Sequence, residues 1–480
     1  MGKKQTLENN LIENTKYKLD SEIINLIKQF INERKSLTNI AQITNKLSDN
    51  LNNFYYEDLI NFVLNKCFED LKNNQSENSY YYLSVLYFFK ETFPIDNLTN
   101  FNLKVYKSEL KPKNTKNKII LNELNHLFDK NAKRKKTTDI LYKYDINPNE
   151  KKDKTHKLPE NLILLPTSTP SIKAFTIDPS ENESLKDDAV SIREINNVYK
   201  LGIHISDTSN FLKENLELEK YAENKLLTIY LSDRIIHMIP EQLSRKYLSL
   251  EKGKHRNVIS LYLTIDKQGN IIERNFRNET IEIEFNLSYK DAEMILKNEI
   301  KVNSELDRKI KLLDHVSYLL ENRCPKVDYC CDITDNDENH RTSCIIQTMM
   351  VTFNENMAKF MSKKDIPFIF RVQKEPTILE LSDTKSNICL YNEAYYSLEN
   401  IGHYSMDRTH YCHSTAGIRR YMDNLSQKLF NLTFNNLSVN ELRELEKNII
   451  NLVEYANKKE RELRYFIPEY ELCYHNNFKS

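Results

Sequence analysis

The feature that most constrains the fold of this chain is a group of three aspartates. A short apolar segment ends at the first of them, and the polar loop that follows ends with the other two. The segment 175–178 ends at Asp178, and the loop closes with Asp187 and Asp188. Three carboxylates gathered within eleven positions repel one another, so a fold that brings them together needs a cation nearby. A hard divalent ion with oxygen ligands meets that need. The alternative is an acidic surface turn, in which the carboxylates face water.

Length and composition bound the rest of the chain. Its 480 residues predict about three domains. Hydrophobic residues make up 40% of the chain, which is enough for real cores, and 69 basic side chains balance 69 acidic ones. Attraction to nucleic acid must therefore come from local patches. The chain shows no membrane-spanning stretch, no signal peptide and no metal-type spacing of its eight cysteines, so we expect a cytoplasmic protein with reduced thiols.

The first third of the chain divides into two parts. Residues 1–100 are predicted to be helical, because apolar residues recur there at helical spacing. They could form a winged-helix unit or a plain helical bundle. Residues 101–160 are rich in lysine and form either a solvated linker or a small RNA-binding module that guides a phosphate backbone inward.

The remainder mixes strands and helices. Alternation predicts a strand at 198–205, and a glycine-containing turn predicts a hairpin over 259–272. Helical patterns follow at 310–321, 344–361, 393–400, 418–432 and 439–464. The pattern predicts an α+β domain over 161–440, with a C-terminal helix and tail at 441–480.

Eight blocks in this region resemble, in order, the RNase II/RNB family of 3′→5′ exoribonucleases. They are the aspartate loop 175–190 and the segments 202–209, 230–244, 249–256, 354–358, 371–372, 395–403 and 411–423. The resemblance implies a sheet core wrapped by helices, with a channel for single-stranded RNA that ends at a Mg²⁺ site, where Mn²⁺ could substitute. It implies hydrolysis of RNA from the 3′ end to nucleoside 5′-monophosphates.

The resemblance also bears on partners. The family's C-terminal OB-fold barrel is not recognisable in this chain. We therefore expect the helical N-terminal region, or a partner such as a helicase or an RNA-decay complex, to take over RNA loading. We expect the protein itself to be a monomer with no membrane association.

The resemblance assigns metal ligands to the acidic loop. Asp178, Asp187 and Asp188 match three of the family's four metal-loop aspartates, and a metal held there would polarise the phosphate. Asp187 and Asp188 are therefore predicted to be catalytic. Because neighbouring strand residues point to opposite faces, both can reach one metal only from a turn; otherwise one of them orients the loop.

Three further residues are predicted to contact RNA. Arg419 is predicted to lie in the first turn of a helix, where a cation opposes the helix dipole unless it shares an anion with the helix amides. The resemblance makes Arg419 a catalytic residue that grips the scissile phosphate. Arg420 is expected to bind RNA beside it, and Tyr230 to stack on a terminal base. His204 and His413 are expected to be structural.

The chain departs from the family pattern at the metal. The loop is one residue longer, and the fourth aspartate falls at Ser184 or Leu185, neither of which is a good anionic ligand. Glu181 or Glu183 could substitute. Residues 347–348 are Gln-Thr where the family has two glutamates. The alternative interpretation is therefore a catalytically impaired RNB-fold protein that binds RNA or scaffolds a degradation complex.

Overall fold

The computed structural model describes most of the chain in two compact units. The described residues are 24–33, 40, 53–73, 76–92, 124, 137–144, 146, 163, 169–170, 172–179, 184–322, 340–380, 387–390, 392–435 and 437–478. Unit 1 comprises Met1–Pro148, Pro376–Glu393 and Arg461–Ser480, and unit 2 comprises Asn149–Glu375 and Ala394–Glu460. Most of the lysine-rich region 101–160 lies outside the described residues.

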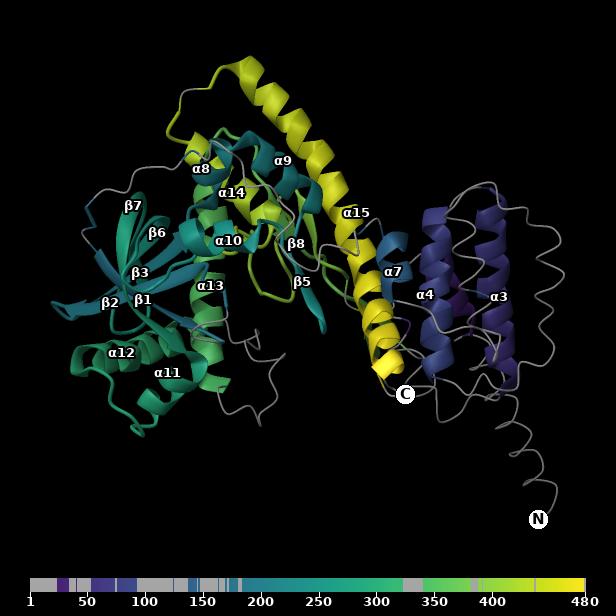
Figure 1. The fold of residues 1–480 in the computed structure, drawn as a ribbon, viewed down its shortest axis with the longest axis horizontal. Helices are drawn as coiled ribbons and strands as arrows, with labels where there is room; N and C mark the ends of the chain where they lie inside the picture. The colour runs from purple at the N-terminus through teal and green to yellow at the C-terminus, as the bar shows by residue number, and fades with distance from the viewer. Residues whose placement is uncertain are drawn as a thin grey trace, which may run out of the picture. The chain divides into compact units, whose positions relative to one another are not determined.

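Unit 1 is mainly helical. Its elements are α3 (Asn53–Lys72), α4 (Ser76–Thr92), α7 (Thr137–Lys143), the end of α15 (Val439–Phe478) and the paired strands β9 (Thr377–Glu380) and β10 (Asn387–Leu390). Helices α3 and α4 pack side by side through buried apolar side chains such as Leu59, Val63 and Val85 (Figure 1). The helical character predicted for residues 1–100 is thus confirmed in its described part.

Unit 2 is built on a closed five-stranded barrel. The strands are β1 (Ile172–Asp178), β2 (Asp188–Ile195), β3 (Val198–Ser206), β6 (His255–Ile265) and β7 (Ile271–Ser288), in the order β1-β2-β3-β6-β7. Neighbours pair antiparallel except β1 and β7, which run parallel and close the barrel. The predicted strand at 198–205 and the predicted hairpin correspond to β3 and to β6–β7.

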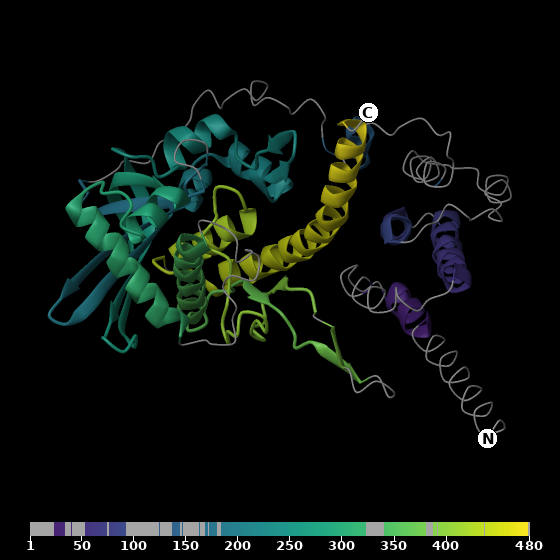
Figure 2. The ribbon, with the colours of Figure 1, turned by 90° about the horizontal axis from the view of Figure 1, so that it is seen from below.

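Helices and short strands surround the barrel. They are α8 (Thr208–Lys213), α9 (Leu216–Lys225), β4 (Ile229–Leu231), β5 (Arg234–Ile236), α10 (Glu241–Leu243), a π-helical turn η3 (Ser244–Leu248), α11 (Tyr289–Leu296), α12 (Ser304–Glu321), α13 (His340–Met361), β8 (Phe370–Val372), β11 (Tyr395–Ser397) and α14 (Tyr421–Leu432). Helices α11 and α12 lie against the barrel strands (Figures 1 and 2). The predicted α+β class, a sheet core wrapped by helices, is confirmed.

Three sequence-based expectations are wrong. The segment 393–400 contains the short strand β11 (Tyr395–Ser397) rather than a helix, because this strand pairs with β8 and its burial alternates. Helix α14 begins at Tyr421, not at Ile418. Cys344 is disulfide-bonded rather than reduced, whereas Cys67, Cys412 and Cys473 keep their thiols outside disulfides. Within the described ranges, every helix falls short of the length or apolarity needed to cross a bilayer.

A buried histidine ties three barrel strands together. His204 Nε2 lies 2.8 Å from Ser191 Oγ, and its Nδ1 lies 2.7 Å from Ser260 Oγ. Burial lowers the pKa of His204 to about 3, so the ring is neutral. These contacts agree with a structural role for His204.

Candidate active site

One cavity brings together residues that the sequence analysis selected from distant segments. Its volume is about 970 Å³, and all six predicted site residues line it: Asp178, Asp187, Asp188, Tyr230, Arg419 and Arg420. Helix α13 supplies Gln347 and Asn354 to the opposite side. Residues separated by more than two hundred positions therefore share one hollow at one end of the barrel.

Barrel topology places two of the aspartates next to each other. Asp178 is the last residue of β1 and Asp188 the first of β2, and these strands run antiparallel with Phe175 opposite Val190. Asp178 is only 7% exposed, and its Oδ2 is buried without a hydrogen-bond partner. Burial, followed by the charge of Asp188, raises the pKa of Asp178 to about 8. Burial, followed by the charge of Asp187, raises the pKa of Asp188 to about 7.

This pair fits a hard cation. A buried carboxylate oxygen without a donor is costly, and the buried Asp178 and the half-buried Asp188 repel each other when both are ionised. An oxygen-preferring divalent ion would relieve both costs. The residues present therefore fit Mg²⁺, and Asp178 and Asp188 are the candidate ligands.

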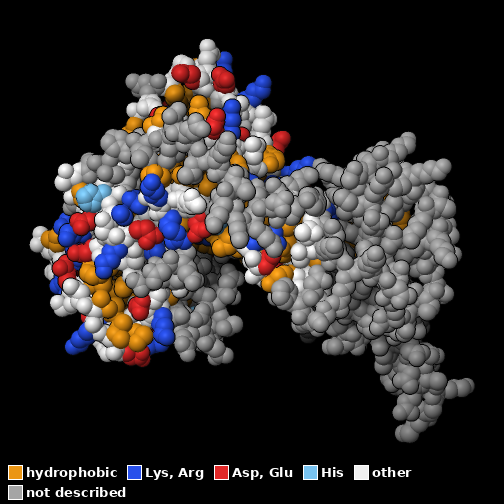
Figure 3. Space-filling view, in the orientation of Figure 1, with side chains coloured by type: hydrophobic (Ala, Val, Ile, Leu, Met, Phe, Trp, Pro, Cys, Tyr) orange, Lys and Arg blue, Asp and Glu red, His pale blue; other side chains and the backbone are white. Residues whose placement is uncertain are grey.

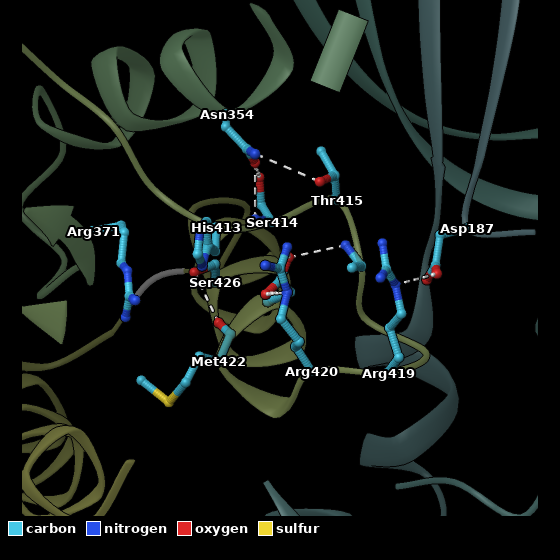
Figure 4. A network of polar contacts seen from close by, with 12 residues as sticks. Asp187, Asn354, Arg371, His413, Ser414, Thr415, Arg419, Arg420, Met422 and Ser426 are labelled. Atoms are coloured by element: carbon cyan, nitrogen blue, oxygen red, sulfur yellow. Dashed lines mark hydrogen bonds and ion pairs between the residues drawn. The ribbon is translucent and has the colours of Figure 1, made fainter. Parts of the chain in front are cut away.

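Asp187 is engaged differently. Its Oδ1 accepts a hydrogen bond from the backbone N–H of Ile418 at 3.1 Å, and its Oδ2 lies 3.4 Å from Nε of Arg419 (Figure 4). Burial raises the pKa of Asp187 to about 6, although Arg419 opposes the shift. In the described part of the chain, no three His, Cys, Asp or Glu side chains form a ready metal site. Asp187 thus connects the acidic loop to Arg419, and its role as a metal ligand stays a prediction.

Arg419 lies before helix α14 rather than in its first turn. A backbone bridge joins Leu227 to Arg420, and the N–H of Thr228 donates to the carbonyl of Arg419 at 2.8 Å. This pairing holds Arg420 extended, with φ −136° and ψ 122°, so the helix cannot start earlier. The predicted clash between Arg419 and the helix dipole therefore does not arise. The side chain of Arg419 is 52% exposed, and it faces the cavity beside Asp187.

Arg420 is held by a buried partner. Its Nη2 donates to Oδ1 of Asp423 at 2.9 Å, and its Nε lies 2.9 Å from the other carboxylate oxygen. Asp423 is fully buried, and it also accepts from the N–H of Ala416 at 2.9 Å. This ion pair holds the loop that presents Arg419. RNA binding by Arg420 stays a prediction.

Asn354 is a second support for the same loop, and sequence analysis gave it no role. Its Oδ1 accepts from both the N–H and the hydroxyl of Ser414 at 2.9 Å, and its amide reaches Thr415 Oγ1 at 3.5 Å (Figure 4). The residue opens one of the family-like blocks, which was the available signal. Its contacts show that α13 positions the loop before Arg419.

Tyr230 stands at the cavity on strand β4. The residue is 53% exposed, and it lines the cavity together with Arg419. Burial of the hydroxyl is the main cause that raises its pKa. A partly exposed aromatic ring beside an arginine is suited to stack on a base while the arginine holds a phosphate.

The departures from the family pattern also lie at the cavity. Ser184 and the half-buried Leu185 line it at the position of the fourth aspartate. Glu181 and Glu183 lie outside the described residues. Gln347 faces the cavity, whereas the buried Thr348 donates to Glu321 at 3.0 Å. That Ser184 or Leu185 takes the place of the fourth aspartate stays a prediction, and neither side chain is an anionic ligand.

The described surface is mixed in charge on the face drawn in Figure 3, where basic and acidic side chains are interspersed. At the cavity itself, the candidate cation for a phosphate is Arg419, which lines it and is 52% exposed.

The raised pKa values of Asp178 and Asp188 should make the stability of the metal-free chain depend on pH. The pKa values of Asp178 and Asp188 are raised from an ordinary 3.8 to about 8 and about 7. The folded chain then holds protons that the unfolded chain releases, so stability is lost as pH rises through this range. We expect the melting temperature in EDTA to fall by roughly 5 °C or more from about pH 5 to about pH 8.5. Mg²⁺ should reduce that fall, and a flat profile in EDTA would contradict the prediction.

The loop before Arg419 is tightly packed at Gly417. A Cβ at this position would lie 2.1 Å from Thr208 Oγ1, which is itself bonded to Gln427 and Asn424. Gly417→Ala should destabilise the fold by roughly 1–3 kcal/mol, measured by denaturant unfolding. Adding Thr208→Ala should recover part of the loss, whereas purely additive effects would show that this contact is not the cause.

Comparisons with known proteins come from sequence and from structure. The family model of the RNB domain matches residues 168–389. The chain is similar to Ribonuclease R of Mycoplasmopsis pulmonis (strain UAB CTIP), with 28% identity over 305 residues that cover 52% of this chain and 42% of that protein. The chain spans less than half the length of this relative.

Two solved structures share the fold. One is Mycoplasma genitalium RNase R in complex with ribose methylated single-stranded RNA, with a TM-score of 0.58 and 20% identity, covering 70% of this chain and 62% of that one. The other is yeast Ssd1, a pseudonuclease, with a TM-score of 0.55 and 16% identity, covering 70% of this chain and 49% of that one. At such identities these likenesses show the fold alone.

Proposed function

This chain belongs to the RNase II/RNB family, and on that premise we propose that it is a Mg²⁺-dependent 3′→5′ exoribonuclease that hydrolyses single-stranded RNA to nucleoside 5′-monophosphates. The observation that carries the proposal is the shared cavity, which is lined by the buried Asp178, the half-buried Asp188 and a partly exposed arginine and tyrosine. Mn²⁺ could replace Mg²⁺.

The residues of the cavity have different roles in the proposed hydrolysis of the phosphodiester bond. Asp178 and Asp188, with Asp187 as the third predicted ligand, would hold Mg²⁺, which would polarise the phosphate when bound. Arg419 donates hydrogen bonds to the phosphate oxygens and stabilises the charge that develops on them. Asp187 holds the guanidinium of Arg419 in place, and Asn354 and Asp423 hold the loop behind it. Tyr230 stacks on a base without regard to its identity, which suits a degradative enzyme.

The alternative function is an RNB-fold subunit that binds RNA or scaffolds a degradation complex without cutting. One observation favours it. Ser184 and Leu185, one of which falls where a fourth carboxylate is expected, both line the cavity, and neither adds negative charge to hold metal. In either case we propose a monomer that receives single-stranded RNA, with a helicase or an RNA-decay complex as the partner that delivers it. A cytoplasmic location stays a prediction.

A labelled-RNA assay separates the two functions. Purified full chain is incubated with Mg²⁺ or Mn²⁺ and single-stranded RNA labelled at the 5′ end or at the 3′ end. The exonuclease should release label from the 3′-labelled RNA at once as a nucleoside 5′-monophosphate and shorten the 5′-labelled RNA stepwise. EDTA should stop both. Tight binding of RNA with no metal-dependent shortening would leave the scaffold function.

A further inference from the structure

The barrel-mouth cavity is a second hollow in unit 2, at the opposite end of the barrel from the candidate active site. Its volume is about 730 Å³, a size typical of small-molecule pockets. Lys173 near the start of β1 and Arg193 toward the end of β2 line it. The active site lies at the other ends of these strands, where β1 ends at Asp178 and β2 begins at Asp188. The extended strand separates Lys173 from Asp178 by roughly 16 Å, and the described residues that line the two cavities differ throughout.

Residues of four barrel strands form one wall of the barrel-mouth cavity. Successive residues of a strand point to opposite faces, so Leu201 and Ile203, on either side of Gly202, are buried in the apolar core behind the wall. The strand register puts four lining residues in one row across β2, β3, β6 and β7: Ser191, Gly202, Tyr262 and Asn275. Hydrogen-bonded strands, and not a loop, therefore fix the positions of this wall.

The glutamates that line the barrel-mouth cavity already have partners there. Glu279 accepts a hydrogen bond from the hydroxyl of Tyr262 at 2.7 Å. Each of the other three contacts a basic or hydroxyl group that also lines the cavity: Glu305 lies 2.7 Å from Nζ of Lys309, Glu284 3.4 Å from Nζ of Lys173, and Glu273 3.1 Å from Oγ1 of Thr264. The negative charge of the cavity is therefore already engaged.

Three arginines that line the same cavity have no acidic partner in the described part of the chain. Within the described ranges, the guanidinium groups of Arg193 and Arg308 make no hydrogen bond or ion pair, and that of Arg277 lies 5.4 Å from the centre of the Tyr262 ring. Six basic and four acidic side chains line the cavity among the described residues, so its net charge is positive. Guanidinium groups match phosphate oxygens and bind them through paired hydrogen bonds. The barrel-mouth cavity is therefore suited to a phosphate.

We propose that the barrel-mouth cavity is a second anion site, which binds the phosphate of a nucleotide. Arg193 and Arg308 hold the phosphate, and the guanidinium of Arg277 beside Tyr262 gives a flat surface on which a base stacks. The volume suits a ligand of nucleotide size. A free nucleoside monophosphate and a nucleotide of an RNA strand both carry this phosphate. The site is separate from the active-site cavity, so the inference does not depend on catalysis.

Protection of arginines from chemical modification tests the inference on the native full chain. The chain is treated in EDTA with phenylglyoxal, which reacts with guanidinium groups, and the modified positions are identified by mass spectrometry. Adenosine 5′-monophosphate or a short single-stranded RNA should slow the modification of Arg193 and Arg308 at least about fivefold, because a bound phosphate occupies their donors. Adenosine, which lacks the phosphate, should protect neither at the same ionic strength. The exposed Arg443 on α15 should react equally in all samples.

Binding by charge-matched variants measures the same contacts. In an Arg419→Ala background, which removes the cation of the active site, adenosine 5′-monophosphate is titrated by calorimetry. The double variant Arg193→Gln/Arg308→Gln should bind at least about tenfold more weakly, since it loses charge-assisted hydrogen bonds to the phosphate. The double variant Arg443→Gln/Lys447→Gln removes the same charge from the exposed face of α15 and should bind as its parent does.

The outcomes separate the two sources of phosphate and the two proposals. Protection by the monophosphate alone identifies a site for a free nucleotide, and protection by RNA alone identifies a second contact for the strand. Protection of neither arginine by either ligand, or unchanged binding in a folded Arg193→Gln/Arg308→Gln variant, overturns the inference and leaves the nuclease function intact. Protection without any RNA shortening in Mg²⁺ overturns the nuclease function alone. If circular dichroism shows that the double variant is unfolded, protection in the native chain decides.

Discussion

Replacing Asp188 with asparagine should lower the rate of RNA shortening by about a thousandfold or more, because the variant loses a ligand of an ion worth several kcal/mol. The same change should stabilise the metal-free chain. At alkaline pH, where both carboxylates are ionised, it removes one of two charges that repel each other at the end of β1 and the start of β2. Initial rates with 5′-labelled RNA and melting curves in EDTA measure both effects.

A matched variant isolates the cause. Asp365→Asn makes the same chemical change at an exposed position and should leave both activity and melting temperature unchanged. A slow Asp188→Asn variant that is also less stable in EDTA would indicate a structural role for this carboxylate. Unchanged activity would remove Asp188 from the active site.

Arg419→Ala should lower the turnover rate by about a hundred- to a thousandfold, the usual cost of losing a donor to the developing charge. RNA binding should weaken only a few-fold, since Tyr230 and the rest of the cavity remain. Arg419→Lys should recover little, because an ammonium cannot reproduce the two-pronged geometry of a guanidinium. Single-turnover rates and RNA dissociation constants, measured separately, distinguish these effects.

The control for Arg419 is an arginine outside the cavity. Arg443 on α15 is exposed, so Arg443→Ala should match the native chain in both measurements. If Arg419→Ala loses binding and turnover in equal proportion, the side chain serves to hold RNA and not to stabilise the reaction. If it loses neither, the proposed role is wrong.

Sequence and structure agree where the signal is local or where a whole block resembles the family. The alternation of apolar and polar residues predicted β3, and the turn after Ile265 predicted the β6–β7 hairpin. The resemblance to the family selected six residues that all line one cavity. The predictions of secondary structure are wrong where pairing with a segment distant in the sequence determines the backbone conformation. Strand β11 exists because it pairs with β8, and α14 starts late because Arg420 pairs with Leu227. No local pattern could show the ion pair of Arg420 with Asp423 or the burial of Lys186.

The cavity's dependence on distant segments has a consequence for the order of events during protein synthesis. Asp178 leaves the ribosome long before Arg419, yet Asp187 finds its hydrogen-bond donor and its ion-pair partner at residues 418 and 419. Contacts of such sequence separation form late. A nascent chain that has not yet released residues 418 and 419 therefore carries the acidic loop without its arginine, so, if the proposed nuclease function holds, a growing polypeptide should be unable to cut RNA.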